Sequence, residues 1–224
     1  MKKIFLVSVL SIFGLACSQS ANVNNNSQID HSQMNHSQMN HGEMNNNSAP
    51  MNHNQMNHSA MESAPNAVSA PYDLQFLDTM IAHHQGAVDM ANLAMTNTNN
   101  ADLKKFSTQI IADQTKEISQ MKDWREKWFA GKSAAMNMEM TGMADSMKMM
   151  SGDEMKKWEA STGKDFDIHF LDMMTPHHVG AVTMAKEALT KSEHAEIKTL
   201  ANQIIKSQEA EIKQMADWKA KWSK

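Results

Sequence analysis

Residues 76–91 read FLDTMIAHHQGAVDMA, and residues 170–185 read FLDMMTPHHVGAVTMA. Both stretches have apolar residues at helical spacing, and both place two adjacent histidines and several methionines inside that pattern. A histidine in an apolar core is costly unless its ring nitrogens have partners. The doubled histidine pair, with soft sulfur nearby, therefore predicts helices that bring metal ligands into the interior of a bundle.

The two stretches belong to a longer internal repeat. Residues 72–128 align with residues 166–222 without a gap at a constant offset of 94, and 28 of the 57 aligned positions are identical. Each copy has two segments of helical periodicity joined by a short polar turn, and we expect Asp73 and Asp167 to cap the first helices. Two such hairpins predict an all-α fold, a four-helix bundle with a pseudo-twofold axis.

Composition divides the rest of the chain. Residues 22–70 are mostly Asn, Ser, His, Met and Gln, so they cannot bury enough apolar surface to fold. The expected segments are a signal peptide at 1–16, a disordered tether at 17–70, a first hairpin at 72–129, a Met-rich linker at 130–165 with a short helix near 153–161, and a second hairpin at 166–224.

The N-terminus predicts export. Lys2 and Lys3 precede an apolar run at 4–16, which is typical of a secretory signal. The run ends in GLAC, and Cys17 is the only cysteine of the chain, as in a bacterial lipobox, although Gly14 stands where Leu is usual. We expect a membrane-anchored lipoprotein, lipidated at Cys17, that faces the periplasm or the cell exterior. The alternative is an ordinary cleaved signal with an incidental cysteine.

The tether repeats a pattern of five residues in which a histidine is followed three residues later by a methionine. These side chains ligate soft and borderline metals, so we interpret the tether as a metal-capture segment as well as a spacer. The alternative is a spacer alone. The residues concerned are His31, Met34, His36, Met39, His41, Met44, His53, Met56, His58 and Met61.

Bulk properties narrow the function. The net charge is -4, the sequence pI is about 6.2 and no basic stripe is visible, which argues against a nucleic-acid partner. The chain has 23 Met and 11 His, and many of these lie in the tether and the linker, where we expect no packed core. A lone cysteine also excludes an intramolecular disulfide.

Heptad spacing separates the paired histidines. On the first helix of each hairpin, His84 and His178 fall on the inward seam, one turn after Met80 and Met174. His83 and His177 fall on the flank of that seam.

The second helices carry polar residues in an otherwise apolar stripe. Gln114 and Glu117 precede Met121, and the second copy has Gln208, Glu211 and Met215. We count both methionines as candidate metal ligands. Each glutamate either ligates metal directly or accepts a hydrogen bond from a histidine N–H and orients its ring. The alternative is a purely structural polar network that sets helix register.

Ligand chemistry favours copper. Thioether sulfur is soft and imidazole is borderline, so together they suit Cu(I), with Ag(I) as a chemical mimic. Imidazole also binds Cu(II). A zinc site would favour cysteine ligands, and the two hairpins contain no cysteine. Di-iron bundles use several inward carboxylates and Glu-x-x-His motifs, which these helices lack.

The runs DLQFLDTMIAHHQGAVDMA and IIADQTKEISQMKDW, with their copies, resemble the DUF305 family over about residues 72–222. The resemblance implies a ferritin-like helical bundle, and copper binding outside the cytoplasm as in CopM-type members. It implies a copper role for Met80, His83, His84 and Met90, and for Met174, His177, His178 and Met184. One departure is Pro176, which replaces Ala82 within the second copy and predicts a kink before its histidines.

The sequence thus predicts an extracytoplasmic copper-binding protein, with Cu(I) as the expected form, that sequesters copper, confers resistance or hands the ion to a transfer protein without catalytic turnover. One alternative is a ferritin-like redox enzyme such as a metal oxidase. The other is a non-metal structural or interaction bundle, in which the tryptophans near the helix ends anchor packing.

Overall fold

The computed structural model describes residues 62–149 and 152–224, which belong to the compact unit Met51–Lys224. The predicted signal peptide, Cys17 and the ten tether residues assigned to metal capture lie outside the described residues. Within these residues all regular structure is helical, and no helix is long and apolar enough to cross a membrane. The elements are η2 (Ala67–Ser69), α1 (Tyr72–Asn97), α2 (Ala101–Phe129), α3 (Met143–Met149), α4 (Asp153–Ala160), α5 (Gly163–Lys191) and α6 (Ala195–Trp222).

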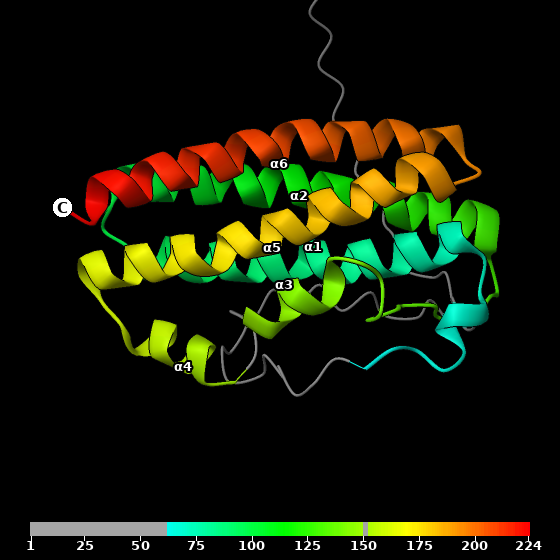
Figure 1. Ribbon diagram of the computed structural model, residues 1–224, viewed down its shortest axis with the longest axis horizontal. Coiled ribbons are helices and arrows are strands. Elements are labelled where there is room, and N and C mark those ends of the chain that lie inside the picture. Colours follow the sequence, from blue (N-terminus) through cyan, green and yellow to red (C-terminus); the bar gives the residue numbers. More distant parts are fainter. Residues whose placement is uncertain (1–61, 150–151) are drawn as a thin grey trace, which may run out of the picture. The chain divides into compact units, whose positions relative to one another are not determined.

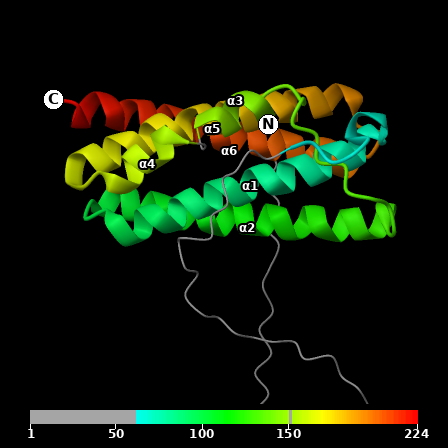
Figure 2. The ribbon, with the colours of Figure 1, turned by 90° about the horizontal axis from the view of Figure 1, so that it is seen from below.

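The four long helices form the bundle, and each repeat supplies one antiparallel pair. Helix α1 packs along α2, α5 packs along α6, and the two hairpins meet chiefly through α1 and α5. Figure 1 shows α1 and α5 running in opposite directions, and Figure 2 shows the α1–α2 hairpin beside the α5–α6 hairpin. The predicted all-α four-helix bundle is confirmed.

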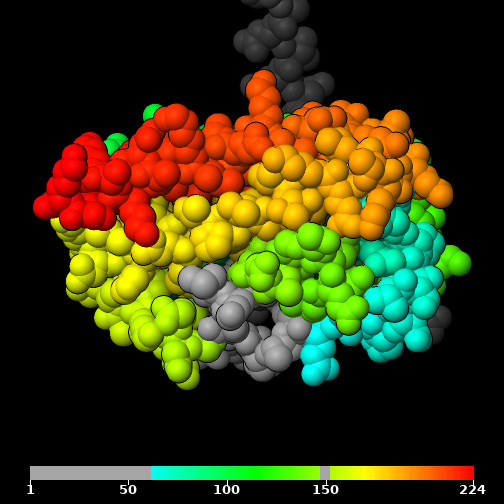
Figure 3. All heavy atoms as spheres, viewed as in Figure 1, coloured from blue at the N-terminus to red at the C-terminus, as the bar shows by residue number. Residues whose placement is uncertain are grey.

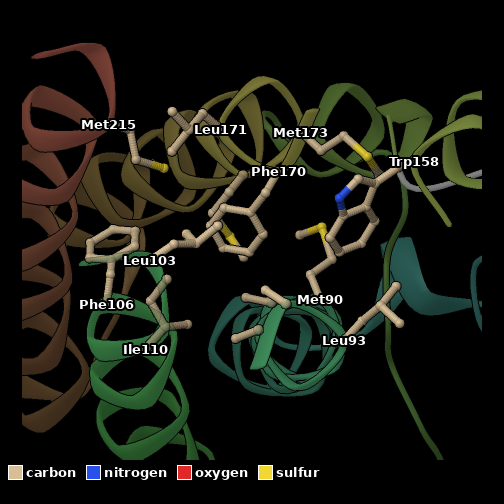
Figure 4. Packing of buried hydrophobic residues seen from close by; sticks show 14 of the residues in the cluster. Met90, Leu93, Leu103, Phe106, Ile110, Trp158, Phe170, Leu171, Met173 and Met215 are labelled. Atoms are coloured by element: carbon tan, nitrogen blue, oxygen red, sulfur yellow. The ribbon is translucent and has the colours of Figure 1, made fainter. Parts of the chain in front are cut away.

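Buried apolar side chains divide into two clusters, one toward each end of the bundle. The cluster in Figure 4 combines the C-terminal half of α1 with the N-terminal halves of α2 and α5. Trp158 of α4 is fully buried there, near Met90 and Met173, and its indole N–H donates to the carbonyl of Phe166 at 3.2 Å. The other cluster combines the N-terminal half of α1 with the C-terminal half of α5 and the start of α6.

Asp73 and Asp167 do not cap their own helices, as we had expected. Both lie inside α1 and α5, which start at Tyr72 and Gly163. Each carboxylate instead bonds to the turn of the other hairpin. Asp73 accepts the backbone N–H groups of Glu193 and His194 at 3.1 and 3.0 Å, and Asp167 accepts the hydroxyl of Thr98 at 2.5 Å. The aspartates thus tie the two hairpins together, a role that repeat spacing alone does not reveal.

The linker is packed, which corrects our expectation of a loose Met-rich segment. We predicted one short helix there, and α4 confirms it, but α3 was missed and α5 begins at Gly163, before the predicted start of the second hairpin at residue 166. The linker methionines Met140, Met143 and Met155 are buried in the two apolar clusters. Core packing therefore accounts for these three methionines, since the flexible methionine side chain suits that role.

One further boundary differs from the prediction. Residues 62–70, which we placed in the tether, include η2, and the N–H of Ala64 donates to the carbonyl of Met136 at 2.8 Å. The folded chain therefore begins before residue 70.

Helix α5 continues through Pro176. The kink expected at this proline stays a prediction.

Helix α3 lies against α5 at a glycine of the repeated motif. Figure 3 shows α3 on the surface of this face, against the C-terminal half of α5. A Cβ built on Gly180 would lie 1.6 Å from the Ser146 hydroxyl oxygen and 2.3 Å from the Gly142 carbonyl oxygen. The second contact involves backbone, so no rotamer change relieves it.

Gly180→Ala is therefore expected to push α3 away from α5 and to lower the free energy of unfolding by about 1–3 kcal/mol, the usual cost of overpacking. Thermal unfolding followed by circular dichroism measures the change. The adjacent Val179→Ala is the control, because Val179 is 48% exposed and should be nearly neutral. Equal melting temperatures for Gly180→Ala and the parent protein would contradict the close packing of α3.

Candidate metal centre

A layer of polar side chains crosses the middle of the bundle, between the two apolar clusters. Each of the four long helices contributes to it near its midpoint. The histidine pairs of α1 and α5 and the two glutamines are buried, with no side chain more than 3% exposed. The two glutamates are largely buried, with side chains 16% and 15% exposed. The layer consists of His83, His84, Gln114, Glu117, His177, His178, Gln208 and Glu211.

The four imidazole rings follow one another across the bundle. His83 and His177 are in contact at the centre, with ring centroids 3.8 Å apart and the rings tilted by 35° to each other. His84 lies 6.2 Å from His83, and His178 lies 6.3 Å from His177. The spacing argument had placed His83 and His177 on the flank. That flank is the surface where α1 meets α5, so both rings are buried between the two hairpins.

Each outer histidine is held by a glutamate from its own hairpin. The Nε2 atom of His84 lies 2.8 Å from Glu117 Oε2, and that of His178 lies 2.8 Å from Glu211 Oε2. An ionised carboxylate only accepts hydrogen bonds, so Nε2 carries the proton in both rings. The neutral ring then has its lone pair on Nδ1. The sequence left open whether the glutamates meet metal or a histidine proton, and here each glutamate oxygen lies at hydrogen-bond distance from a histidine nitrogen.

Six buried imidazole nitrogens in this layer have no hydrogen-bond partner: both nitrogens of His83 and of His177, and Nδ1 of His84 and of His178. The side-chain oxygens of Gln114 and Gln208 are also without one. A buried polar atom left unpaired costs about 1–3 kcal/mol. A purely structural network would be expected to pair these atoms, and here they have no partner among the described residues.

Burial keeps the central histidines neutral. The pKa of His83 and the pKa of His177 are both lowered well below the ordinary value of 6.5, first because burial disfavours the charged ring and then because neighbouring imidazoles would repel it. A neutral imidazole is the form that binds metals.

The six bundle methionines that we predicted as ligands are all buried, and they sort into two groups across the repeat. Met80 and Met121 of the first hairpin share a cluster with Met184 of the second. Met174 and Met215 share the other cluster with Met90 of the first hairpin. Each group therefore combines sulfur from both hairpins, on opposite sides of the histidine layer.

The described part of the chain contains no group of three His, Cys, Asp or Glu residues positioned to hold one ion. Imidazoles here come in pairs, so a metal centre at this layer needs thioether sulfur to complete its ligands. Such a mixed set favours a soft ion.

Thr175 was missed by our sequence analysis; its hydroxyl donates to the sulfur of Met215 at 3.8 Å. No sequence signal marks it, because its counterpart in the first repeat is Ile81.

The profile described as "Domain of unknown function (DUF305)" matches residues 73–219. The chain belongs to the DUF305 family. Among solved structures of the family, a DUF305 protein from Streptomyces coelicolor is 30% identical, with a TM-score of 0.61, and the match covers 71% of this chain and 95% of that one. No curated protein sequence matches this chain.

Two other solved structures are those of CopM. CopM in the Cu(II)-bound form is 39% identical, with a TM-score of 0.57, and the match covers 67% of this chain and 97% of that one. CopM in the Cu(I)-bound form is 36% identical, with a TM-score of 0.55, and the match covers 67% of this chain and 96% of that one. This DUF305 chain is thus similar to a protein that binds copper in both oxidation states.

Proposed function

We propose that this DUF305 protein binds copper, with Cu(I) as its main form, at the polar layer in the middle of its bundle. The observation that carries the proposal is the set of six buried imidazole nitrogens without a hydrogen-bond partner. Copper binding would supply partners for nitrogens that are otherwise costly to bury. The similarity to CopM supports the choice of metal.

The donor set explains the preference for a soft ion. Nδ1 of His84 and Nδ1 of His178 present lone pairs because the glutamates hold the protons on Nε2. The central pair, His83 and His177, offers further neutral nitrogens, and methionine sulfur lies in both adjoining clusters. Without a thiolate, thioether sulfur and imidazole favour Cu(I) over Zn²⁺.

The role we propose is sequestration or handover, without catalytic turnover. The histidine layer lies deep in the bundle, and we expect copper to be held there and passed on rather than cycled with oxygen. We further propose that the protein is exported, that Cys17 anchors it to a membrane, and that the histidines and methionines of the tether capture copper loosely. A metal-transfer protein would be the receiving partner.

The test separates the bundle from the tether. In the full chain, the ten tether residues proposed to bind metal are replaced by serine, which keeps the chain length. Anaerobic titration with Cu(I) against a competing chelator should show that this variant loses weak sites and keeps the tightest one. The parent protein serves as the control. Unfolded protein gives the background of Cu(I) binding by exposed methionines.

If the serine variant no longer competes with the chelator for Cu(I), the bundle does not bind copper tightly and the proposal fails. Oxygen consumption measured with the copper-loaded protein addresses the enzymatic alternative. We expect oxygen to be consumed at the same rate as with copper bound to the chelator alone. A faster rate that saturates would favour an oxidase.

A further inference from the structure

The two ends of the bundle differ at one position of the repeat. Near the α5–α6 turn, the imidazole of His194 lies between a carboxylate and an indole. Its Nδ1 atom is 2.5 Å from Asp73 Oδ2, and its ring stacks on Trp128 with centroids 3.9 Å apart and an interplanar angle of 18°. The edge of Phe129 closes the site at 6.1 Å.

At the other end the same offset of 94 gives Asp167 and Trp222, but the counterpart of His194 is Asn100. Asn100 turns away to cap α2, and its Oδ1 accepts the N–H groups of Asp102 and Leu103 at 3.0 and 3.3 Å. No imidazole of the described chain therefore lies at this position.

A cleft of about 380 Å³ is found here, and the residues that line it are Asn99, Asn100, Gly163, Lys164, Asp167 and Trp222. The counterpart of Phe129 is Ser223, so the aromatic ring that closes the first end has no counterpart at this position. The cleft thus combines the carboxylate and the indole of the first end with open space where that end has an imidazole.

The groups that line the cleft are held in place. The Asp167 side chain is only 7% exposed, and the Thr98 hydroxyl bonds to one of its oxygens. Trp222 stacks on Trp218, with centroids 5.1 Å apart and an interplanar angle of 12°. Trp218 in turn packs edge-on against Phe106 at 5.2 Å. A preorganised aromatic face and a buried acceptor reduce the entropy that a ligand must lose.

We propose that this cleft binds an imidazole ring from outside the folded domain, either free histidine or the histidine side chain of a peptide. The ring stacks on Trp222 and donates an N–H to Asp167, as His194 does with Trp128 and Asp73. The Asp167 carboxylate accepts the ring N–H, and the exposed Lys164 lines the same cleft. This site lies away from the histidine layer and does not depend on copper.

The test uses metal-free full-length protein at pH 8.5, where imidazole is neutral, and follows the indole N–H resonances of its five tryptophans. Added imidazole should shift the Trp222 resonance saturably, with a dissociation constant on the order of 1 mM, as suits so small a ligand. Neutral 1-methylimidazole has the same ring with a methyl group in place of the N–H, and should bind about fivefold more weakly or worse. Equal binding of the two rings would overturn the proposed contact with Asp167.

Two variants exchange the residues found at positions 100 and 194. They test whether the residue at this position of the repeat decides if an external imidazole can bind. Asn100→His should place an imidazole in the cleft and abolish the response of Trp222. His194→Asn should open the first end and create a new response at Trp128. Circular dichroism checks that both variants fold, and histidine already occupies the N-cap position of α6. An unchanged response in Asn100→His, or no saturable shift in the parent protein, would refute the proposal.

The source of the ring is distinguished by two further ligands. Free histidine carries a carboxylate that can meet Lys164, whereas N-acetylhistidine amide mimics a residue in a peptide. Tighter binding of free histidine assigns the site to the amino acid, and equal or tighter binding of the blocked form assigns it to a peptide side chain. If neither shifts Trp222 while imidazole does, the cleft admits only the bare ring and the proposed sources are wrong.

Discussion

Replacing both central histidines by leucine, in the double variant His83→Leu with His177→Leu, should make the metal-free protein more stable while removing the proposed tight copper site. The two rings bury four nitrogens without hydrogen-bond partners, and leucine has a similar volume without polar atoms. Replacing unpaired buried polar groups by apolar ones of the same size is favourable. We expect a gain of about 2 kcal/mol or more in the free energy of unfolding, or roughly 4–8 °C in Tm.

The same two substitutions that stabilise the metal-free protein should weaken its binding of copper. In the background with serine in the tether, the leucine pair should weaken Cu(I) binding about 100-fold or more, which is about 2.7 kcal/mol. His169→Leu is the matched control, because His169 lies on the same helix outside the polar layer and should leave copper affinity unchanged. A leucine pair that destabilises the metal-free protein by as much as a core truncation would mean that the histidines are structural.

Acid should destabilise the metal-free protein through the same two residues. The pKa values of His83 and His177 lie well below 6.5 in the folded state, because burial and the neighbouring rings disfavour their protonation. The unfolded chain has an ordinary pKa near 6.5, so below that pH it binds two protons that the folded protein does not. Unfolding is then favoured as pH falls, by about 3 kcal/mol in total between pH 8 and pH 5.5.

Urea unfolding of the metal-free protein at a series of pH values measures this loss, and the leucine pair supplies the comparison. The difference in unfolding free energy between the parent protein and the variant should widen steadily below about pH 6.5, since the variant lacks both titrating rings. Other titrating groups are common to both proteins and cancel. A constant difference from pH 8 to pH 5.5 would mean that the central rings already bind protons in the folded state.

The sequence was sufficient for the fold because the repeat is strong. Helical periodicity in each copy and short polar turns left few arrangements other than two antiparallel hairpins closing a bundle. It also identified the residues of the polar layer, because histidine, glutamine and glutamate interrupt stripes that are otherwise apolar. The linker was misjudged for a physical reason. Met140 and Met143 are soft metal ligands and flexible core fillers alike, and only contacts distinguish the two roles.

What the sequence determined by itself is local: which segments are helical, which positions repeat at the offset of 94, and which side chains carry ligand chemistry. Tertiary structure decided which of those side chains meet. Heptad spacing describes one helix and its nearest partner, so it placed His84 on the seam but could not show that the ring of His83 meets that of His177 in the other hairpin. The crossed bonds of Asp73 and Asp167, and the cleft beside Asn100, likewise arise only where residues 69 to 121 positions apart are brought together.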